Sequence, residues 1–346
     1  MAVPEVAPFR RRAHLAVFDA TTLTARGIKE QLVARSFPAA SVRMFTSSTD
    51  ADSNLTEFAG EAMLVTSPDI DTLGNLDIAF LCGTRQEGEK YLDWAGRAGF
   101  VAIDLTRASS GADNATPVNA SVNSEAILDR QPVISTPHPV SQMLSTLLAP
   151  VRRRCGLKEA VVVVLQPASE RGEPGIDELY QQTLSLMNFN EMPKKVFGRQ
   201  LAFNLIPGQL AEEDRNVSAT RRDIEREVRR ITGGEYSLSV QVIRAPVFNG
   251  YAAMAHVTLA GGKGREDLLA AFKGVVGIST GQQGVGATPI ERVGESDVLV
   301  TGVEPALGDS TFWFWAVADD LAGGTSLNAV RIAEILLETG FGRGGA

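Results

Sequence analysis

The sequence predicts a two-domain α/β protein, in which a parallel sheet with helices on both faces is followed by an α+β domain with a mixed sheet. The chain has 346 residues, which is enough for two domains of ordinary size. Over roughly the first 135 residues, short apolar runs alternate with helical patterns, as in a parallel sheet built from strand–helix–strand units. After Pro137-His138-Pro139 the strands lengthen and polar residues alternate within them, which is typical of antiparallel or mixed sheets.

Composition and charge exclude several classes of protein. With 44% hydrophobic and 21% charged residues, the chain is neither disordered nor fibrous. A net charge of -8 argues against a nucleic-acid partner. The two cysteines form neither a disulfide framework nor a zinc signature. No apolar stretch approaches the roughly 20 residues that cross a bilayer, and no secretion signal is recognisable, so we expect a cytoplasmic protein without a membrane partner.

The predicted elements of the first domain follow one another in strand and helix order. Apolar runs predict the strands, and apolar residues at helical spacing predict the helices. The predicted strands are 15–18, 42–45, 62–66, 76–81, 100–104 and 132–135, and the predicted helices are 25–34 and 87–99.

The second domain has longer predicted elements. Its predicted strands are 160–165, 236–244 and 252–259, and its predicted helices are 141–154, 218–231 and 326–337. In the charged helix, residues such as Glu225 and Arg229 pair at helical spacing, which predicts a solvated face. The aromatic run at 312–315 predicts a late strand that contributes to the core and to an interface.

Three segments carry a resemblance to a known family. They are 201–207 (L-A-F-N-L-I-P), 243–250 (I-R-A-P-V-F-N-G) and 328–334 (N-A-V-R-I-A-E). In this order and spacing they resemble the A-F-N-x-I-P, R-x-P-V-x-x-G-H and N-A-V-x-I-A-E segments of the aspartate-semialdehyde dehydrogenase family. The likeness runs almost from end to end of the chain.

The resemblance implies a Rossmann-like NAD(P)-binding-type domain over residues 1–135, completed by the C-terminal helix of 325–346. It implies a semialdehyde-dehydrogenase-type dimerisation domain over 136–324, whose sheet forms the face of a homodimer. NADP is the cofactor that the family implies, and amino-acid biosynthesis is its pathway. In the family, a cysteine thiolate attacks an aldehyde, hydride passes to the cofactor, and phosphate then releases an acyl phosphate.

The segment that would hold the cofactor departs from the family pattern G-A-T-G-x-V-G. Glycine permits the tight turn and the close approach of pyrophosphate to a helix N-terminus. Here Asp19, Thr22 and Ala25 occupy the three glycine positions. Thr22 adds a branched side chain and Asp19 a negative charge where the phosphates would lie, whereas Ala25 is compatible. The arginine for the 2′-phosphate is replaced around 47–49, and D-N-L-R-K-G becomes D-D-L-A-G-G at 319–324, so we expect impaired dinucleotide binding.

The nucleophile of the family is also replaced. Its N-P-N-C-[ST]-T segment aligns with 136–141, which puts Pro139 at the position of the cysteine. Proline has no nucleophilic atom, so no thioester can form there. Cys82 and Cys155 are predicted to be small buried hydrophobic residues. Ser141 is predicted to cap the following helix.

The catalytic base is replaced as well. Tyr251 stands where the family has histidine, and a tyrosine with an ordinary pKa of about 10 accepts a proton poorly at neutral pH. His138 is a candidate substitute, although a structural histidine between two prolines is the favoured interpretation.

Some substrate positions are changed and others are kept. The family's phosphate-binding arginine has no counterpart near 109–111, and Thr220, Arg221 and Asp223 replace its Glu-Glu and Lys. The residues that match the family are Arg244, Asn123, Gln166 and Asn328. Arg244 would bind a substrate carboxylate in bidentate geometry, Asn123 would help to bind substrate, Gln166 would lie beside the nucleophile, and Asn328 would lie on the cofactor side. Structural retention explains the asparagines and Gln166 equally well.

Three hypotheses follow. Because groups that act as a unit are changed together, the leading hypothesis is a catalytically inactive homologue that acts by binding or dimerisation, as a homodimer or in a mixed dimer with an active paralogue. The alternative is an NAD(P)-dependent oxidoreductase of altered chemistry on a small carboxylate-bearing aldehyde or a related amino-acid-pathway metabolite. It would use Arg244 to hold the carboxylate and His138 or Tyr251 to move protons. A residual semialdehyde dehydrogenase is the third.

Overall fold

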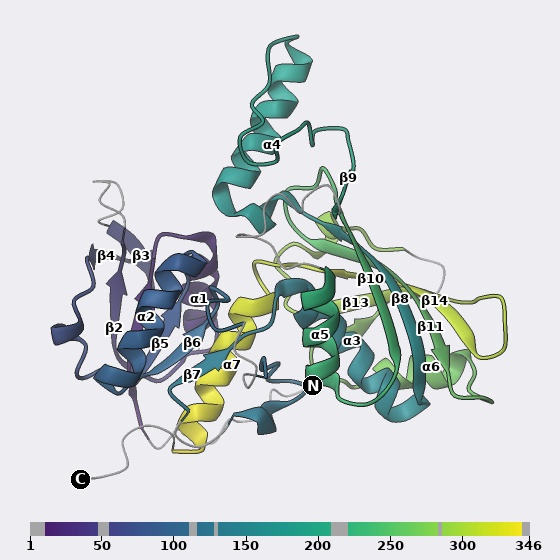
Figure 1. The fold of residues 1–346 in the computed structure, drawn as a ribbon, viewed down its shortest axis with the longest axis horizontal. Helices are drawn as coiled ribbons and strands as arrows, with labels where there is room; N and C mark the ends of the chain where they lie inside the picture. The colour runs from purple at the N-terminus through teal and green to yellow at the C-terminus, as the bar shows by residue number, and fades with distance from the viewer. Residues whose placement is uncertain are drawn as a thin grey trace. The chain divides into compact units, whose positions relative to one another are not determined.

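The chain folds as two compact units in the computed structural model, which describes residues 11–47, 55–110, 116–127, 131–208, 221–282 and 286–340 (Figure 1). The first unit consists of Met1–Ala115, Ser124–Thr136 and Ala329–Ala346. The second consists of Thr116–Asn123 and Pro137–Asn328.

The first unit contains a seven-stranded sheet in the order β3-β4-β2-β1-β5-β6-β7. The strands are β1 Ala13–Phe18, β2 Ala39–Phe45, β3 Leu55–Phe58, β4 Glu61–Thr66, β5 Ile78–Leu81, β6 Val101–Asp104 and β7 Val133–Ser135. All neighbouring pairs are parallel except β3 and β4. The predicted Rossmann-like parallel sheet is therefore confirmed, with its topological switch point between β1 and β5.

Apolar side chains explain why these strands are central. Every residue of β5 and β6 is buried, which matches the near-continuous hydrophobic runs expected of parallel strands. Helices α1 Leu23–Ala34 and α2 Arg85–Ala98 follow β1 and β5. Tyr91 of α2 packs on Phe18 of β1 with ring centroids 4.5 Å apart.

The last helix, α7 Gly324–Glu338, contributes its residues from Ala329 onward to the first unit. Glu334 of α7 accepts hydrogen bonds from Arg35, the residue that ends α1, at 2.6 and 2.8 Å. This ion pair joins two elements about 300 residues apart in the sequence.

The second unit contains a mixed seven-stranded sheet in the order β12-β13-β14-β11-β8-β10-β9. Its strands are β8 Leu157–Gln166, β9 Ile206–Pro207, β10 Ser237–Arg244, β11 Tyr251–Leu259, β12 Ile278–Thr280, β13 Val298–Pro305 and β14 Thr311–Ala318. The interior strand β8 pairs parallel with β10 and antiparallel with β11, which confirms the predicted mixed sheet.

Helices cover one face of this second sheet. Besides the start of α7, the unit contains the α-helices α3 Pro139–Cys155, α4 Gly172–Met187, α5 Arg221–Thr232 and α6 Arg265–Phe272. Among the described residues of both units, the 3-10 helices are Ile70–Thr72, Ser124–Ala126, Ala168–Arg171 and Pro289–Arg292. In Figure 1, α3, α5 and α6 lie on one side of the sheet, whereas α4 stands clear of it. The core between the sheet and these three helices includes Phe272 of α6 against Phe314 of β14, with ring centroids 5.5 Å apart.

The opposite face of the second sheet carries apolar side chains that are exposed. Because side chains alternate along a strand, β14 places Phe312 and Phe314 in the core and Trp313 on the other face. We call this the open face, and define it by Val161, Met254 and Trp313, which are 38%, 40% and 41% exposed. The predicted aromatic strand is thus confirmed, and its residues divide between two surfaces.

The charged helix α5 differs from the solvated face predicted for it. Its start was predicted at 218, and residues 218–220 lie outside the described residues. Glu225 forms the predicted pair with Arg229 at 4.0 Å, but it also accepts a hydrogen bond from the backbone N–H of Val240 at 3.0 Å. Glu227 is buried. Charge on this helix therefore anchors neighbouring backbone as well as facing water.

Candidate functional site

The loop after β1 keeps the backbone shape of a glycine-rich turn but fills it with a side chain. Asp19 has φ 54°, a left-handed conformation that glycine adopts most readily and that Asp tolerates. Its carboxylate is buried and accepts hydrogen bonds from the backbone N–H and the hydroxyl of Ser47, each at 3.1 Å. The carboxylate of Asp19 therefore lies where the sequence predicts a phosphate position, and it is bound to Ser47, two residues after the end of β2.

Both helix N-termini next to this loop are capped by the chain itself. At α1, the hydroxyl of Thr22 accepts a hydrogen bond from the N–H of Ala25 at 3.2 Å. At α2, Glu87 accepts one from the N–H of Thr84 at 2.7 Å in a capping box. Backbone N–H groups at such positions are the ones that bind pyrophosphate in a glycine-rich loop.

Two carboxylates meet above Gly83, which follows β5. A Cβ atom on Gly83 would lie 2.1 Å from Oδ2 of Asp19 and 2.6 Å from Oε2 of Glu87. Burial raises the pKa of Asp19, and the charge of Glu87 raises it further. Negative charge is thus concentrated at the position where the sequence analysis expects the pyrophosphate.

Asn328 and Asn123 both hold one loop of the second unit. Asn328 donates to the carbonyl of Val118 at 2.7 Å and accepts from the N–H of Ala120 at 2.8 Å. Asn123 donates to the carbonyl of Pro117 at 3.0 Å and accepts from the N–H of Asn119 at 2.8 Å. Each amide uses both of its ends within this loop, which is the structural retention that the sequence left open.

Pro139, at the predicted nucleophile position, is the first residue of α3. The helix starts two residues earlier than predicted, because proline fits the first helical position. The prediction that Ser141 caps this helix is therefore wrong: Nδ1 of His138 accepts the N–H of Val140 at 3.1 Å instead. The hydroxyl of Ser141 is buried and has no hydrogen-bond partner among the described residues.

His138 is surrounded by two carboxylates. Its Nε2 lies 2.8 Å from Oε1 of Glu170, and its backbone N–H donates to Oε2 of Glu227 at 2.9 Å. Because Nδ1 accepts a backbone hydrogen bond, we assign the ring proton to Nε2, which donates to Glu170. The ring is 2% exposed and both of its nitrogens are engaged, so neither is available to accept a proton from a substrate.

Neither cysteine lies at the nucleophile position. Cys155 is the last residue of α3, so the rise of an α-helix places it about 24 Å from Pro139. Cys82 belongs to the first unit and follows β5. Both are buried, as predicted, and burial raises the pKa of Cys155 and raises that of Cys82 well above the ordinary value. Both sulfurs therefore favour the thiol over the nucleophilic thiolate.

Three predicted site residues come together at one end of the second sheet. Gln166, at the end of β8, is the register partner of Arg244, at the end of β10. The pairing of Ala252 with Leu165 brings Tyr251 beside Gln166. All three residues are buried, and the hydroxyl of Tyr251 has no hydrogen-bond partner among the described residues. Three buried polar residues thus lie side by side at this end of the sheet.

A partly buried acid near these residues escaped the sequence analysis. Asp320 accepts hydrogen bonds from the hydroxyl of Ser169 at 2.6 Å and from the N–H of Gly250 at 2.7 Å. Burial raises the pKa of Asp320 to about 6. The one signal in the sequence was Asp at the Asn position of D-N-L-R-K-G. Glu170 and Glu227 were also missed, because nothing in the sequence relates them to His138.

The remaining predicted positions make local contacts or fall outside the described residues. Oδ2 of Asp104 accepts the N–H of Ser109 at 2.8 Å, close to where the family has its phosphate-binding arginine. Arg221 lies 3.9 Å from Glu225, and Asp223 pairs with Arg226, all on α5. Four positions lie outside the described residues: Ser48, Thr49, Gly111 and Thr220.

The described residues contain neither a metal-binding cluster nor a helix that could span a membrane. Over residues 11–340, apart from the gaps given above, no group of three or more His, Cys, Asp or Glu side chains could hold a metal ion. Over the same ranges, no helix has the length and apolarity that crossing a bilayer requires.

The chain combines a Rossmann-like domain with a mixed-sheet domain that carries Gln166 and Arg244 at one end of its sheet. This combination is typical of two-domain dehydrogenase folds. The family profile "Semialdehyde dehydrogenase, NAD binding domain" matches residues 14–130. The profile "Semialdehyde dehydrogenase, dimerisation domain" matches residues 148–322. The chain belongs to the aspartate-semialdehyde dehydrogenase family.

Individual relatives agree over nearly the whole chain. The aspartate-semialdehyde dehydrogenase of Rickettsia conorii is 28% identical over 338 residues, which cover 94% of this chain and 98% of that protein. A "USG-1 protein homolog" of Pseudomonas aeruginosa is 29% identical over 343 residues with the same coverage. The structure of aspartate semialdehyde dehydrogenase II from Vibrio cholerae superposes with a TM-score of 0.87 at 26% identity, covering 96% of this chain and all of that one. Relatives of different names are equally similar, so the site residues must decide the activity.

Proposed function

We propose that this chain is a catalytically inactive member of the aspartate-semialdehyde dehydrogenase family that acts by binding or dimerisation. Pro139 carries the proposal, because the family reaction begins with a thiolate at this position. The two thiols of the chain are buried, and one of them lies at the far end of α3. The surroundings of His138 support the same conclusion, since its two ring nitrogens bind Glu170 and the N–H of Val140.

The proposal includes the loss of NADP binding in the manner of the family. Asp19 and Glu87 place carboxylates where pyrophosphate would need N–H donors, and Thr22 caps the helix that would receive it. Repulsion between these carboxylates and a phosphate group opposes binding.

The binding partner in this proposal is a second copy of the chain, joined through the open face. Burying Val161, Met254 and Trp313 against a partner would remove their exposed apolar surface from water. The match of residues 148–322 to a dimerisation domain supports a homodimer. A mixed dimer with an active paralogue would use the same surface.

Calorimetric titration with NADPH and with NADH tests the inactive state. We expect no measurable binding up to about 1 mM cofactor. We also expect no aspartate-semialdehyde dehydrogenase turnover, measured with the Rickettsia conorii relative as the positive control. Turnover by the purified chain would refute the proposal. Micromolar cofactor binding without turnover would refute its cofactor part alone.

The oligomeric state tests the dimer. Trp313→Glu should weaken self-association at least about 100-fold, because it buries a charge without a partner in the interface. Leu64→Glu is the control, since Leu64 is 65% exposed on β4 of the first unit. Sedimentation of the two variants and the unmodified chain measures the effect. A monomeric unmodified chain, or equal weakening by both variants, would contradict the proposed interface.

An altered oxidoreductase is the second candidate, and the cluster of Gln166, Arg244 and Tyr251 favours it. Arg244 would hold a carboxylate, and the buried hydroxyl of Tyr251 lies close by in the sheet register. A screen of small carboxylate-bearing aldehydes with NADPH separates the two candidates. Reduction that is lost in Arg244→Ala and Tyr251→Phe would support altered chemistry; no reduction supports the inactive state.

A further inference from the structure

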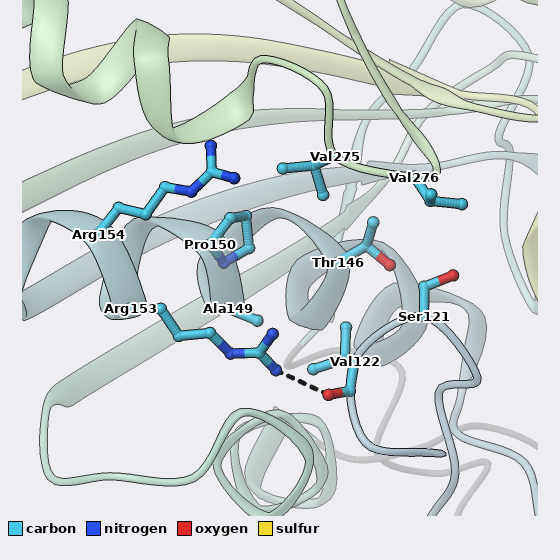
Figure 2. A pocket seen from close by; sticks show the side chains of 9 residues that line it. All are labelled: Ser121, Val122, Thr146, Ala149, Pro150, Arg153, Arg154, Val275 and Val276. Atoms are coloured by element: carbon cyan, nitrogen blue, oxygen red, sulfur yellow. Dashed lines mark hydrogen bonds between the residues drawn. The ribbon is translucent and has the colours of Figure 1, made fainter.

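A pocket in the second unit lies between α3 and the loop that ends at Asn123, and it includes none of the nucleophile, base or cofactor positions. Its volume is about 280 Å³. Nine residues line it, all within the second unit: Ser121, Val122, Thr146, Ala149, Pro150, Arg153, Arg154, Val275 and Val276 (Figure 2). They come from α3, from the loop that precedes Asn123, and from the segment between α6 and β12.

The floor of the pocket is the buried face of α3. Thr146, Ala149 and Pro150 are each buried. The hydroxyl of Thr146 donates to the carbonyl of Gln142 at 2.9 Å and accepts from the amide of Asn119 at 3.0 Å, which fixes its side chain. Pro150 has no N–H, so it cannot bond the carbonyl of Thr146 as a residue four positions later in a helix would. The floor is therefore rigid and largely apolar.

Two arginines make one part of the rim positive. Arg153 donates from one terminal nitrogen to the carbonyl of Val122 at 2.7 Å, a bond drawn in Figure 2. Arg154 donates from one terminal nitrogen to the carbonyls of Ala270 and Ala271 at 2.8 and 3.2 Å. Because a guanidinium has five N–H donors, each arginine is oriented by these bonds and keeps further donors for a ligand.

No acidic side chain lines the pocket, and within the described residues no carboxylate forms an ion pair with Arg153 or Arg154. This is notable in a chain whose net charge is -8. The apolar wall of Val122, Val275 and Val276 adjoins these cations. A positive rim beside an apolar wall suits an anion that carries a hydrocarbon group.

We propose that this pocket binds a small organic carboxylate with a short branched aliphatic chain. Its carboxylate would accept charge-assisted hydrogen bonds at the arginine end, and its chain would lie against the valines. The volume of about 280 Å³ is just below the range of pockets for drug-sized ligands, which limits the ligand to a small metabolite. This site is independent of the inactive state proposed above, because none of its residues belongs to the nucleophile, base or cofactor positions.

Methyl-detected NMR of the full chain, titrated with 3-methylbutanoate, tests the site. We expect saturable shifts at the methyl groups of Thr146, Ala149 and Val122, with a dissociation constant of about 1 mM. The neutral isostere 3-methylbutanamide should bind at least about tenfold more weakly, because it cannot form the charge-assisted bonds. Absence of saturable shifts at these methyl groups, or equal binding of acid and amide, would overturn the proposal.

A pair of neighbouring arginines supplies matched variants. Arg153→Gln should weaken 3-methylbutanoate binding at least about tenfold. Arg152→Gln removes the same charge from the same turn of α3, but its guanidinium lies against Gly234, where a Cβ would be 2.6 Å from its nitrogen. We expect Arg152→Gln to change the affinity less than about twofold. Equal weakening by both variants would show that only the general charge of the turn matters, and would refute the assigned site.

Discussion

The loop after β1 and the start of α3 differ in how they depart from the family pattern. In the loop, residues with side chains stand at the glycine positions of the family pattern. The carboxylate of Asp19 accepts the N–H of Ser47, and the hydroxyl of Thr22 accepts the N–H of Ala25. At the start of α3, Pro139 stands where the family pattern has cysteine, whereas Gln166 and Arg244 at the ends of β8 and β10 match the pattern. In the proposal above, the loop is therefore changed by added side chains, and the second unit by the lack of a nucleophilic atom at Pro139.

This difference has an energetic meaning. The carboxylate of Asp19 is buried beside Glu87, and its raised pKa shows that its charged form is disfavoured there. The carboxylates of Glu170 and Glu227 instead hold His138 by its ring and its backbone. Asp19 in the loop should therefore cost stability, and Glu170 and Glu227 beside His138 should supply it.

The largest expected effect is that of Glu227→Ala. It leaves the buried N–H of His138 without its acceptor, so the free energy of unfolding should fall by about 2 kcal/mol. Denaturant unfolding at pH 7 measures this, with the exposed Glu235→Ala as the control. A loss no larger than that of the control would show that the carboxylate does not stabilise the start of α3.

The double variant Asp19→Gly/Thr22→Gly tests whether the side chains of the loop after β1 oppose cofactor binding. Glycine suits the positive φ of residue 19, and the change removes one carboxylate and one helix cap from the phosphate position. Because the unmodified chain is expected to show no binding up to about 1 mM NADPH, we expect the double variant to bind with a dissociation constant of about 100 μM or lower by calorimetry, which is at least about tenfold tighter. Thr72→Gly, in the 3-10 helix Ile70–Thr72 of the same unit, is the control, because the side chain of Thr72 bonds Asp69 and Arg43 and not the loop. Unchanged affinity would mean that the cofactor site is lost elsewhere.

Much of the fold was predictable because its signals are local. The apolar runs of β5, β6 and β8 predicted buried strands, and the structure contains them. Helices α4 and α6 and strand β13 were not predicted. The start of α4 contains Gly172 and Pro174, which are weak helix formers, and α6 has only eight residues.

The contacts around the candidate site could not be predicted, because tertiary structure creates them. His138 meets Glu170 and Glu227 across 32 and 89 residues of sequence, and neither glutamate belongs to a motif. Even the local error at α3 had a physical cause: Pro139 starts the helix early, so the cap moves from Ser141 to His138. The sequence alone showed which positions differ from the family pattern. It did not show which residues surround those positions in the folded chain.

The smallest expected effect concerns Asp320, an acid near Tyr251 whose pKa is raised by burial, as that of Asp19 is. Its pKa of about 6 in the folded chain exceeds its ordinary value of 3.8, so folding favours the protonated form. The stability gained from protonation is complete below about pH 3.8 and is lost as the pH rises through about 6.

Asp320→Asn should therefore stabilise the chain at alkaline pH and not at acid pH. The amide can still accept from the N–H of Gly250 and can donate to Ser169, and it carries no charge. Because Asp320 is only half-buried, we expect a gain of about 1 kcal/mol at pH 8 that disappears near pH 4. Thermal unfolding at both pH values measures it, with Asp93→Asn on the exposed face of α2 as the control. A difference in stability that is the same at both pH values would show that the charge of Asp320 does not cause the effect. Asp320 would then resemble Glu170 and Glu227, the stabilising carboxylates near α3.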